Sequence, residues 1–167
     1  MPQDNSYPEL LVREADLTDA RDAKSVVEMV AMYATDPMAG GFTLSDEVRD
    51  RLPEALRNTP GCVVFLAYAD DSDTAASLGV AVCFEGLSTF RAQPKLNLHD
   101  LAVSPEARGR GVGRALMDAV LAEAQRRGCC YATLEVHPDN SVAKGLYASS
   151  GFEPGYEFWN CELGGGG

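Results

Sequence analysis

Residues 98–117 read LHDLAVSPEARGRGVGRALM, and this stretch decides the fold. It begins as an extended, mostly apolar segment, passes through a glycine-rich loop, and continues as an amphipathic helix predicted over 112–127. Val112, Leu116 and Val120 recur at helical spacing, so one face of this helix is apolar. The pattern therefore predicts a strand whose end meets the N-terminus of a helix across a glycine-rich turn.

The rest of the chain supplies further short elements around this unit. The patterns predict strands at 10–14, 62–69, 78–84, 95–103 and 131–136, a helix of about fifteen residues after 19, helices at 45–57 and 140–150, and a closing pair of short strands at 152–163. This order contains antiparallel meanders and no steady strand-helix-strand alternation. It predicts an α+β fold with a mixed, mostly antiparallel central sheet flanked by helices.

Length and composition limit the organisation of the chain. The 167 residues, with a mass of 17.9 kDa and 46% hydrophobic side chains, suffice for one substantial core but not for two ordinary domains. We expect one domain over 1–163 and a flexible glycine tail at 164–167. The sequence contains neither a signal peptide nor an apolar run of about eighteen residues, which predicts a cytoplasmic protein with no membrane segment.

Charge and cysteine usage exclude some partners. A net charge of −11 argues against nucleic acid, because phosphate backbones are bound by an excess of basic residues on one face. The same charge favours a small cationic substrate, although acidic surfaces also serve solubility. The five cysteines are odd in number and show no CxxC spacing, which predicts free thiols and no metal site.

The glycine-rich loop has the chemistry of an anion site. Glycines lack Cβ atoms, so backbone N–H groups can turn toward an anion, and the helix N-terminus adds unpaired donors. Three of the 14 basic residues, Arg108, Arg110 and Arg114, lie within this short stretch. The alternative is a flexible turn with a solvated basic helix start. A dinucleotide fingerprint would require glycine at Arg114, and a P-loop would require Gly-Lys-Ser/Thr, so hydride transfer and nucleotide hydrolysis are disfavoured.

The stretch 98–117 resembles the central motif of the GNAT superfamily of acetyl-CoA-dependent N-acetyltransferases, and LEVHPDNSVAKGLYASSGF at 134–152 is similar to a second motif of that family. The resemblance implies acetyl-CoA as the donor and the acyl-CoA N-acyltransferase fold. It implies main-chain contacts to the pantetheine from the strand before the loop and to the pyrophosphate from the loop. These residues are Leu101, Ala102 and Val103, followed by Arg108, Gly109, Arg110, Gly111, Val112, Gly113 and Arg114.

The second motif carries the expected acid. Acetyl transfer from a thioester to an amine requires a deprotonated amine, a polarised carbonyl and a stabilised thiolate. Tyr147 matches the family position that protonates the thiolate, although packing against the sheet is the alternative role. Asn140 lies seven residues earlier, so it can face the cofactor from the same helix, and it also fits the position of the helix N-cap.

The base and the acceptor contacts are less specific. His99 and Asp100 are the candidate bases, and strand alternation lets only one of them face a given side. Residues 78–103 are also similar to the diamine acetyltransferase branch, although His99 departs from its acidic pattern, and this branch implies a homodimer. Glu85 and Asp100 are candidate partners for a substrate ammonium, or ordinary solvated carboxylates. A diamine, a polyamine or a basic amino acid is the expected acceptor.

Two other functions compete with the N-acetyltransferase. A noncatalytic acyl-CoA-binding regulatory module could keep the loop and bind a protein partner through its acidic surface. Retention of both Asn140 and Tyr147 argues against that function, since binding alone needs no proton donor near sulfur. A nucleotide-dependent oxidoreductase is the third interpretation of the glycines.

Overall fold

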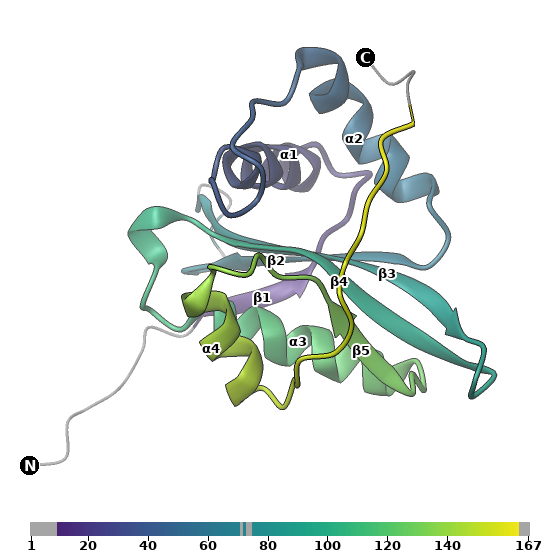
Figure 1. Cartoon of the computed structure of the whole chain (residues 1–167). Coiled ribbons are helices and arrows are strands. Elements are labelled where there is room, and N and C mark those ends of the chain that lie inside the picture. The colour runs from purple at the N-terminus through teal and green to yellow at the C-terminus, as the bar shows by residue number, and fades with distance from the viewer. Residues whose placement is uncertain (1–9, 71, 73–74, 164–167) are drawn as a thin grey trace, which may run out of the picture.

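The protein is built on a five-stranded sheet with helices on both faces (Figure 1). The computed structural model describes residues 10–70, 72 and 75–163. Its elements are β1 (Leu11–Glu14), α1 (Ala20–Ala34), α2 (Asp46–Asn58), β2 (Cys62–Tyr68), β3 (Ser77–Ser88), β4 (Gln93–Val103), the short 3-10 helix η1 (Pro105–Ala107), α3 (Val112–Arg126), β5 (Tyr131–Leu134) and α4 (Ser141–Ser149).

The strand order is β1-β2-β3-β4-β5. Neighbours from β1 to β4 are antiparallel, whereas β5 is parallel to β4. The helices α1 and α2 cover one face of the sheet, α3 covers the other, and α4 lies beside α3 (Figure 1). The predicted α+β fold with a mixed, mostly antiparallel sheet is therefore confirmed.

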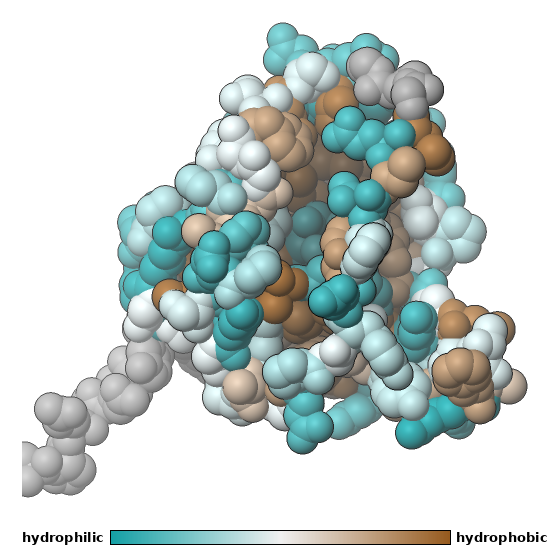
Figure 2. All heavy atoms as spheres, viewed as in Figure 1, coloured by the Kyte–Doolittle hydropathy of each residue, from teal (hydrophilic) through white to brown (hydrophobic). Residues whose placement is uncertain are grey.

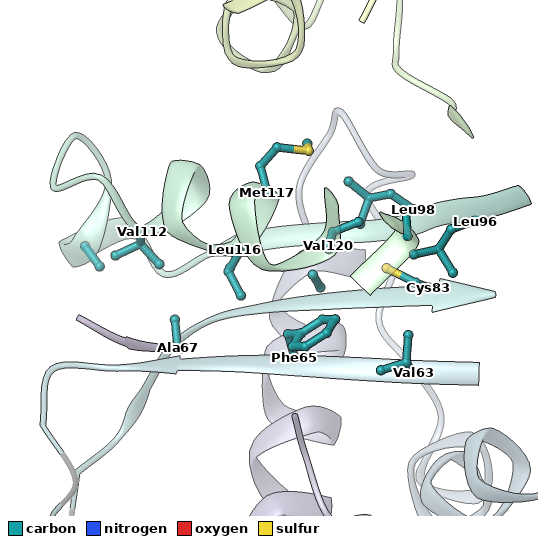
Figure 3. Close-up of a cluster of buried hydrophobic side chains, with 13 residues drawn as sticks. Val63, Phe65, Ala67, Cys83, Leu96, Leu98, Val112, Leu116, Met117 and Val120 are labelled. Carbon is teal, nitrogen blue, oxygen red and sulfur yellow. The ribbon is translucent and has the colours of Figure 1, made fainter. Parts of the chain in front are cut away.

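Each face of the sheet buries its own hydrophobic cluster. Val112, Leu116 and Val120 of α3 are fully buried against side chains of β2, β3 and β4, among them Phe65 and Leu98 (Figure 3). On the opposite face α1 and α2 cover a second cluster, which includes Val26, Leu56, Leu66 and Val82. The helical spacing that predicted the apolar stripe of α3 thus corresponds to burial against the sheet.

Helix ends follow from local chemistry. The Asp19 side chain accepts hydrogen bonds from the N–H groups of Arg21 and Asp22, both at 3.0 Å, and so caps α1. Ser45 caps α2 in the same manner through Val48. Gly128 follows α3 with φ of +68°, the left-handed conformation that commonly ends a helix.

The closing pair of strands predicted at 152–163 is wrong. Residues 152–163 contain no strand, and Tyr156, Phe158 and Trp159 are exposed there. Apolar and aromatic residues favour strands only where a neighbouring strand can receive their backbone hydrogen bonds, and this segment has no such neighbour. The glycine tail predicted at 164–167 lies outside the described residues. Among the helices of the described residues, none has both the length and the apolar character needed to cross a membrane.

Candidate active site

The strands β4 and β5 separate partway along β4. Their pairing runs from Lys95 opposite Tyr131 to Leu98 opposite Leu134. On its other side β4 stays paired with β3 as far as Val103. Among the residues that the structure describes, backbone groups on the outer edge of 99–103 therefore have no strand partner, although backbone N–H and C=O groups demand hydrogen bonds. This fork is where an extended ligand can add its own polar groups to the sheet.

A β-bulge lies at the fork. The register between β3 and β4 shifts after Val82, which is opposite Asp100, and this leaves His99 as an extra residue in β4. Val82 belongs to the cluster under α1 and α2, as does Phe84, whose ring meets the His99 ring with 5.4 Å between centroids. Both candidate bases therefore lie toward α1 and α2. The expectation that only one could face a given side is wrong, because the bulge cancels strand alternation.

The glycine-rich loop forms a cradle of unpaired amides. Gly109 and Gly111 have φ of +73° and +84°, values that favour glycine, and Gly111 is the N-cap of α3. Within the described residues, no hydrogen bond reaches a set of five backbone N–H groups at this turn. They belong to Gly109, Gly111, Val112, Gly113 and Arg114. These donors, with the positive end of the α3 dipole, are suited to a phosphate group.

A buried serine lies between the fork and the cradle. Ser104 follows β4 directly and is 4% exposed. Its Oγ is the one buried side-chain polar atom of the described residues without a hydrogen-bond partner. Such atoms are rare in folded proteins because an unmade hydrogen bond costs about 1–3 kcal/mol.

The three loop arginines have different surroundings. Arg108 forms an ion pair with Asp36, with Nη2 and Oδ2 3.2 Å apart. Arg114 donates to the hydroxyl groups of Ser149 and Ser150 and so ties α3 to α4. The side chain of Arg110 is exposed and makes no hydrogen bond or ion pair within the described part of the chain. Of the three guanidinium groups, that of Arg110 is therefore the one available to an incoming anion.

Helix α4 carries the two residues singled out in the second motif. Asn140 is its N-cap, accepting a hydrogen bond from the N–H of Ala143 at 3.0 Å, so the capping role is present. Tyr147 is half-buried, and its ring packs beside that of Phe152. Burial, with a smaller contribution from the nearby Tyr33, raises the pKa of the Tyr147 phenol to about 12. Its hydroxyl therefore stays protonated at neutral pH and has a proton to donate.

Tyr33 is a site residue that sequence reasoning missed. It lies near the end of α1, and its pKa is raised by burial and by the carboxylates of Asp100 and Asp36. Tyr33 packs against the cluster under α1 and α2, whereas Tyr147 packs against the cluster under α3, so the two side chains come from opposite faces of the sheet. No local motif marks Tyr33, because only the docking of α1 on the sheet brings it to this place.

Asp100 is half-buried at the bulge and lacks a cationic clamp. Burial raises the pKa of its carboxyl group, and the neighbouring His99 acts in the opposite direction. Within the described residues no hydrogen bond or ion pair reaches its carboxylate. A carboxylate in these surroundings has an increased affinity for a proton, as a general base requires.

A second carboxylate stands where the strands part. Glu135 directly follows β5, and the Asn97 amide nitrogen lies 3.4 and 3.3 Å from its two carboxylate oxygens. The same nitrogen is 3.2 Å from Oγ1 of Thr133 in β5. Asn97 thus links β4 to Thr133 of β5 and holds Glu135 at the fork. Sequence reasoning passed over Glu135, although it lies within the stretch quoted for the second motif.

Glu85 is separated from this site. It accepts a hydrogen bond at 3.0 Å from Arg127, which follows α3, and its strand partner is Leu96 of the cluster under α3. Asp100 lies toward α1 and α2. The structure therefore does not bring the two carboxylates together around one ammonium group, and Glu85 belongs to an ion-pair network with Arg127 and Glu123.

The strand before the loop offers its backbone and not its side chains. Leu101 and Val103 pack against the cluster under α3, whereas Ala102 is buried under α1 and α2. The main-chain role expected for these three residues is compatible with the unpaired edge of β4. Within the described residues, no group of three or more His, Cys, Asp or Glu side chains could hold a metal ion.

The site thus consists of a strand that separates from its neighbour and a cradle of amides at the start of a helix. Residues 26–152, which include both features, match the model of the acetyltransferase (GNAT) family. The chain belongs to the GNAT acetyltransferase family. The match includes the bulge, the cradle, Asn140 and Tyr147, so the resemblance of the two motifs to this superfamily is confirmed.

Two curated relatives are similar to this chain in sequence, and one solved structure is similar to it in fold. The chain is 30% identical to mycothiol acetyltransferase of Beutenbergia cavernae over 82% of its own length and 43% of the relative. It is 40% identical to N-alpha-acetyltransferase RimI of Mycobacterium tuberculosis over 47% of its length and 49% of the relative. It thus spans under half of each. A crystal structure of a probable acetyltransferase has a TM-score of 0.73 at 23% identity, covering 93% of this chain and 96% of the other, and shows the shared fold.

Proposed function

We propose that this GNAT protein is an acetyl-CoA-dependent N-acetyltransferase that transfers the acetyl group to a primary amine by direct attack in a ternary complex. The observation that carries the proposal is the continuous path from the unpaired edge of β4 to the five unpaired amides at the start of α3. An extended donor with amide groups at one end and a pyrophosphate at the other matches this path.

The residues present fit such a donor. The backbone of Leu101–Val103 would pair with the pantetheine amides, as a neighbouring strand would. The cradle amides and Arg110 would hold the pyrophosphate, with charge-assisted hydrogen bonds that are stronger than neutral ones. Asn140, already the cap of α4, would be a further donor contact. Arg108 would join the phosphate group by exchanging its partner Asp36, which is partly exposed.

The chemistry requires two proton transfers. The amine nitrogen attacks the thioester carbonyl carbon, an N–C bond forms, the C–S bond breaks, and the thiolate leaves. Tyr147, whose phenol is protonated at neutral pH, gives its phenolic proton to the sulfur. The amine proton passes to Asp100, directly or through water, and His99 beside it is the alternative acceptor. Glu135 is an additional candidate base, because it is held at the same fork.

The acceptor is proposed from the charge of the fork. Asp100 and Glu135 give it negative charge, which favours a cationic amine. This charge makes a diamine, a polyamine or a basic amino acid one group of candidate acceptors. A protein or peptide N-terminus is another group, because one of the relatives reported above is named for N-alpha acetylation. Another relative is named for mycothiol. The cytoplasmic location stays a prediction.

The proposal is tested by thiol release over an amine panel together with calorimetric titration of acetyl-CoA. The panel contains diamines, polyamines, basic amino acids and peptides with a free N-terminus. We expect micromolar binding and turnover of at least one amine. Binding without turnover of any amine would favour the noncatalytic acyl-CoA-binding module, and absence of binding would contradict the donor site.

The acetyl-CoA affinities of two arginine variants test where the pyrophosphate of the donor binds. Arg110→Ala should weaken acetyl-CoA binding about tenfold, the effect of losing one charge-assisted hydrogen bond of about 1.5 kcal/mol. Arg57→Ala removes an equally exposed arginine from α2 and should leave affinity unchanged. Equal affinity of both variants would remove Arg110 from the pyrophosphate site.

A further inference from the structure

The ion pair between Asp36 and Arg108 joins two parts of the proposed site. Arg108 directly precedes the amide cradle, and its Nη2 lies 3.2 Å from Oδ2 of Asp36. Asp36 belongs to the loop that follows α1, just beyond the last residue of that helix. The pair therefore connects the α1 side of the fork to the place where the pyrophosphate of the donor is proposed to bind.

Hydrogen bonds within its own loop hold Asp36 in place independently of Arg108. The second carboxylate oxygen of Asp36, Oδ1, accepts a hydrogen bond from the N–H of Met38 at 2.9 Å. The carbonyl oxygen of Asp36 accepts from the backbone N–H groups of residues 39–41 at 2.8–3.1 Å. Because these bonds are local to the loop, the carboxylate keeps its position when Arg108 turns away.

The ion pair is weak enough to be exchanged for a phosphate group. The Arg108 side chain is 58% exposed and that of Asp36 is 29% exposed, and water screens the attraction between exposed charges. Arg108 and Asp36 share a single hydrogen bond. A pyrophosphate carries more negative charge than a carboxylate, and its oxygens can accept two N–H groups of the planar guanidinium at once. Arg108 should therefore leave Asp36 when the donor binds.

The exchange changes the charge that an acceptor meets at the fork. In the free protein Arg108 neutralises Asp36, and among the residues that the structure describes it is the one cation paired with that carboxylate. After the exchange, Oδ2 of Asp36 has lost its counter-ion. A carboxylate that is partly buried and unpaired favours a new cation, because burial penalises a lone charge.

Asp36 and Asp100 lie near the same tyrosine. Burial raises the pKa of the Tyr33 phenol, and the carboxylates of Asp100 and Asp36 raise it further. Asp36 also donates its backbone N–H to the carbonyl oxygen of Tyr33 at 2.9 Å, so the two residues share one turn at the end of α1. Figure 2 shows that the surface is hollowed between α1 and α4, so this side of the fork is open to solvent. A molecule with two positive charges can place one at each carboxylate.

We propose that Asp36 is a specificity residue of the acceptor site, and that Arg108 masks it until the pyrophosphate of the donor takes its place. This role rests on the proposed acetyl-CoA site and makes recognition of a second positive charge on the acceptor depend on the donor. Asp100 meets the reacting amine, and Asp36 meets the second ammonium group. Because coupling between two binding sites is reciprocal, a doubly charged acceptor also strengthens binding of the donor.

Calorimetric titration with 1,4-diaminobutane tests the coupling, and n-butylamine is the singly charged control of the same length. CoA without an acetyl group replaces the donor, so that no turnover occurs during the titration. We expect the diamine to bind CoA-saturated protein about tenfold more tightly than free protein, a typical size for coupling between two sites. The affinity for n-butylamine should differ by less than about twofold between the two forms.

Two variants should change the coupling in opposite ways. Asp36→Asn removes the charge, while its amide oxygen can still accept the hydrogen bond from Met38. It should abolish the gain for the diamine without weakening CoA binding. Arg108→Ala should bind CoA more weakly, yet in its free form it should bind the diamine about as tightly as CoA-saturated wild type does, because Asp36 is unmasked. Asp50→Asn, exposed on α2, should keep the full gain, and far-UV circular dichroism checks the fold of each variant.

The masking of Asp36 by Arg108 is overturned by equal diamine affinity with and without CoA, by a full gain in Asp36→Asn, or by diamine binding to free Arg108→Ala as weak as to free wild type. Binding of CoA without any coupling to the diamine would overturn the role of Asp36 and leave the proposed donor site intact. Protein that does not bind CoA would contradict both.

Discussion

Asp22 and Asp100 are two carboxylates on the same side of the sheet with opposite surroundings. Asp22, 2% exposed, accepts two hydrogen bonds from Arg13 at 2.6 and 2.7 Å and one from the N–H of Asp16 at 2.8 Å. The hydrogen bonds from Arg13 hold its pKa below the ordinary value despite burial. Asp100 has no such partner, and burial raises its pKa. A clamped carboxylate stabilises the fold, whereas an unclamped one at a fork can exchange a proton.

The largest effect is expected from Asp22→Ala. The Asp22 carboxylate is buried and accepts three hydrogen bonds of 2.6–2.8 Å, so its removal should lower the free energy of unfolding by about 3–5 kcal/mol at pH 7. Because the folded-state pKa of Asp22 is depressed, its contribution is present above the unfolded-state value near 3.8 and is lost as pH falls through the folded-state value. Urea unfolding at pH 7 and at about pH 3 measures both. Asp50→Asn, on the exposed side of α2, is the control, and equal stability of the two variants would contradict the clamp.

Asp100→Asn tests the second carboxylate of the comparison, the proposed general base. Turnover should fall about a hundredfold or more, the usual contribution of a general base, with little change in unfolding free energy. In the wild type, turnover should decrease as pH falls through the raised pKa of Asp100, because the protonated carboxyl group cannot accept a proton. This acid limb should disappear in the variant. Asp118→Asn, exposed on α3, should behave as wild type, and an acid limb retained in Asp100→Asn would transfer the role of base to Glu135 or His99.

Tyr147→Phe tests the proposed proton donor to the sulfur. The ring and its packing beside Phe152 are retained, so acetyl-CoA affinity should change less than about threefold while kcat falls about a hundredfold. Steady-state kinetics and calorimetry separate the two quantities. Tyr131→Phe removes a hydroxyl group from β5 and is the matched control. Unchanged kcat in Tyr147→Phe at every pH would show that its hydroxyl is not the acid.

His99→Gln should give the smallest effect. The charge of His99 lowers the pKa of Asp100, so removing the imidazole should move the acid limb to higher pH. Turnover near pH 8 should fall less than tenfold. The pH profile of kcat/KM checks this expectation, and a loss as large as that of Asp100→Asn would make His99 the base itself.

Local patterns predicted much of the fold and of the donor site. The glycines of the loop, the apolar stripe of α3 and the cap at Asn140 act over a few residues, so sequence spacing determines them. The strand at 62–69 and the helix at 112–127 agree with β2 and α3 to within a residue. The closing strands at 152–163 failed because a strand depends on a neighbour that the local pattern does not specify.

The glycine-rich turn that forms the amide cradle and the Asn140 cap of α4 were thus determined by the sequence itself, because a turn and a helix cap depend only on residues close together in the chain. The tertiary structure alone decided which side chains meet at the fork. The bulge placed His99 and Asp100 on one side, strand register put Glu85 on the other, and the docking of α1 brought Tyr33 near Tyr147. These outcomes depend on pairing between residues far apart in the chain, where a shift of one residue reverses the face of every side chain.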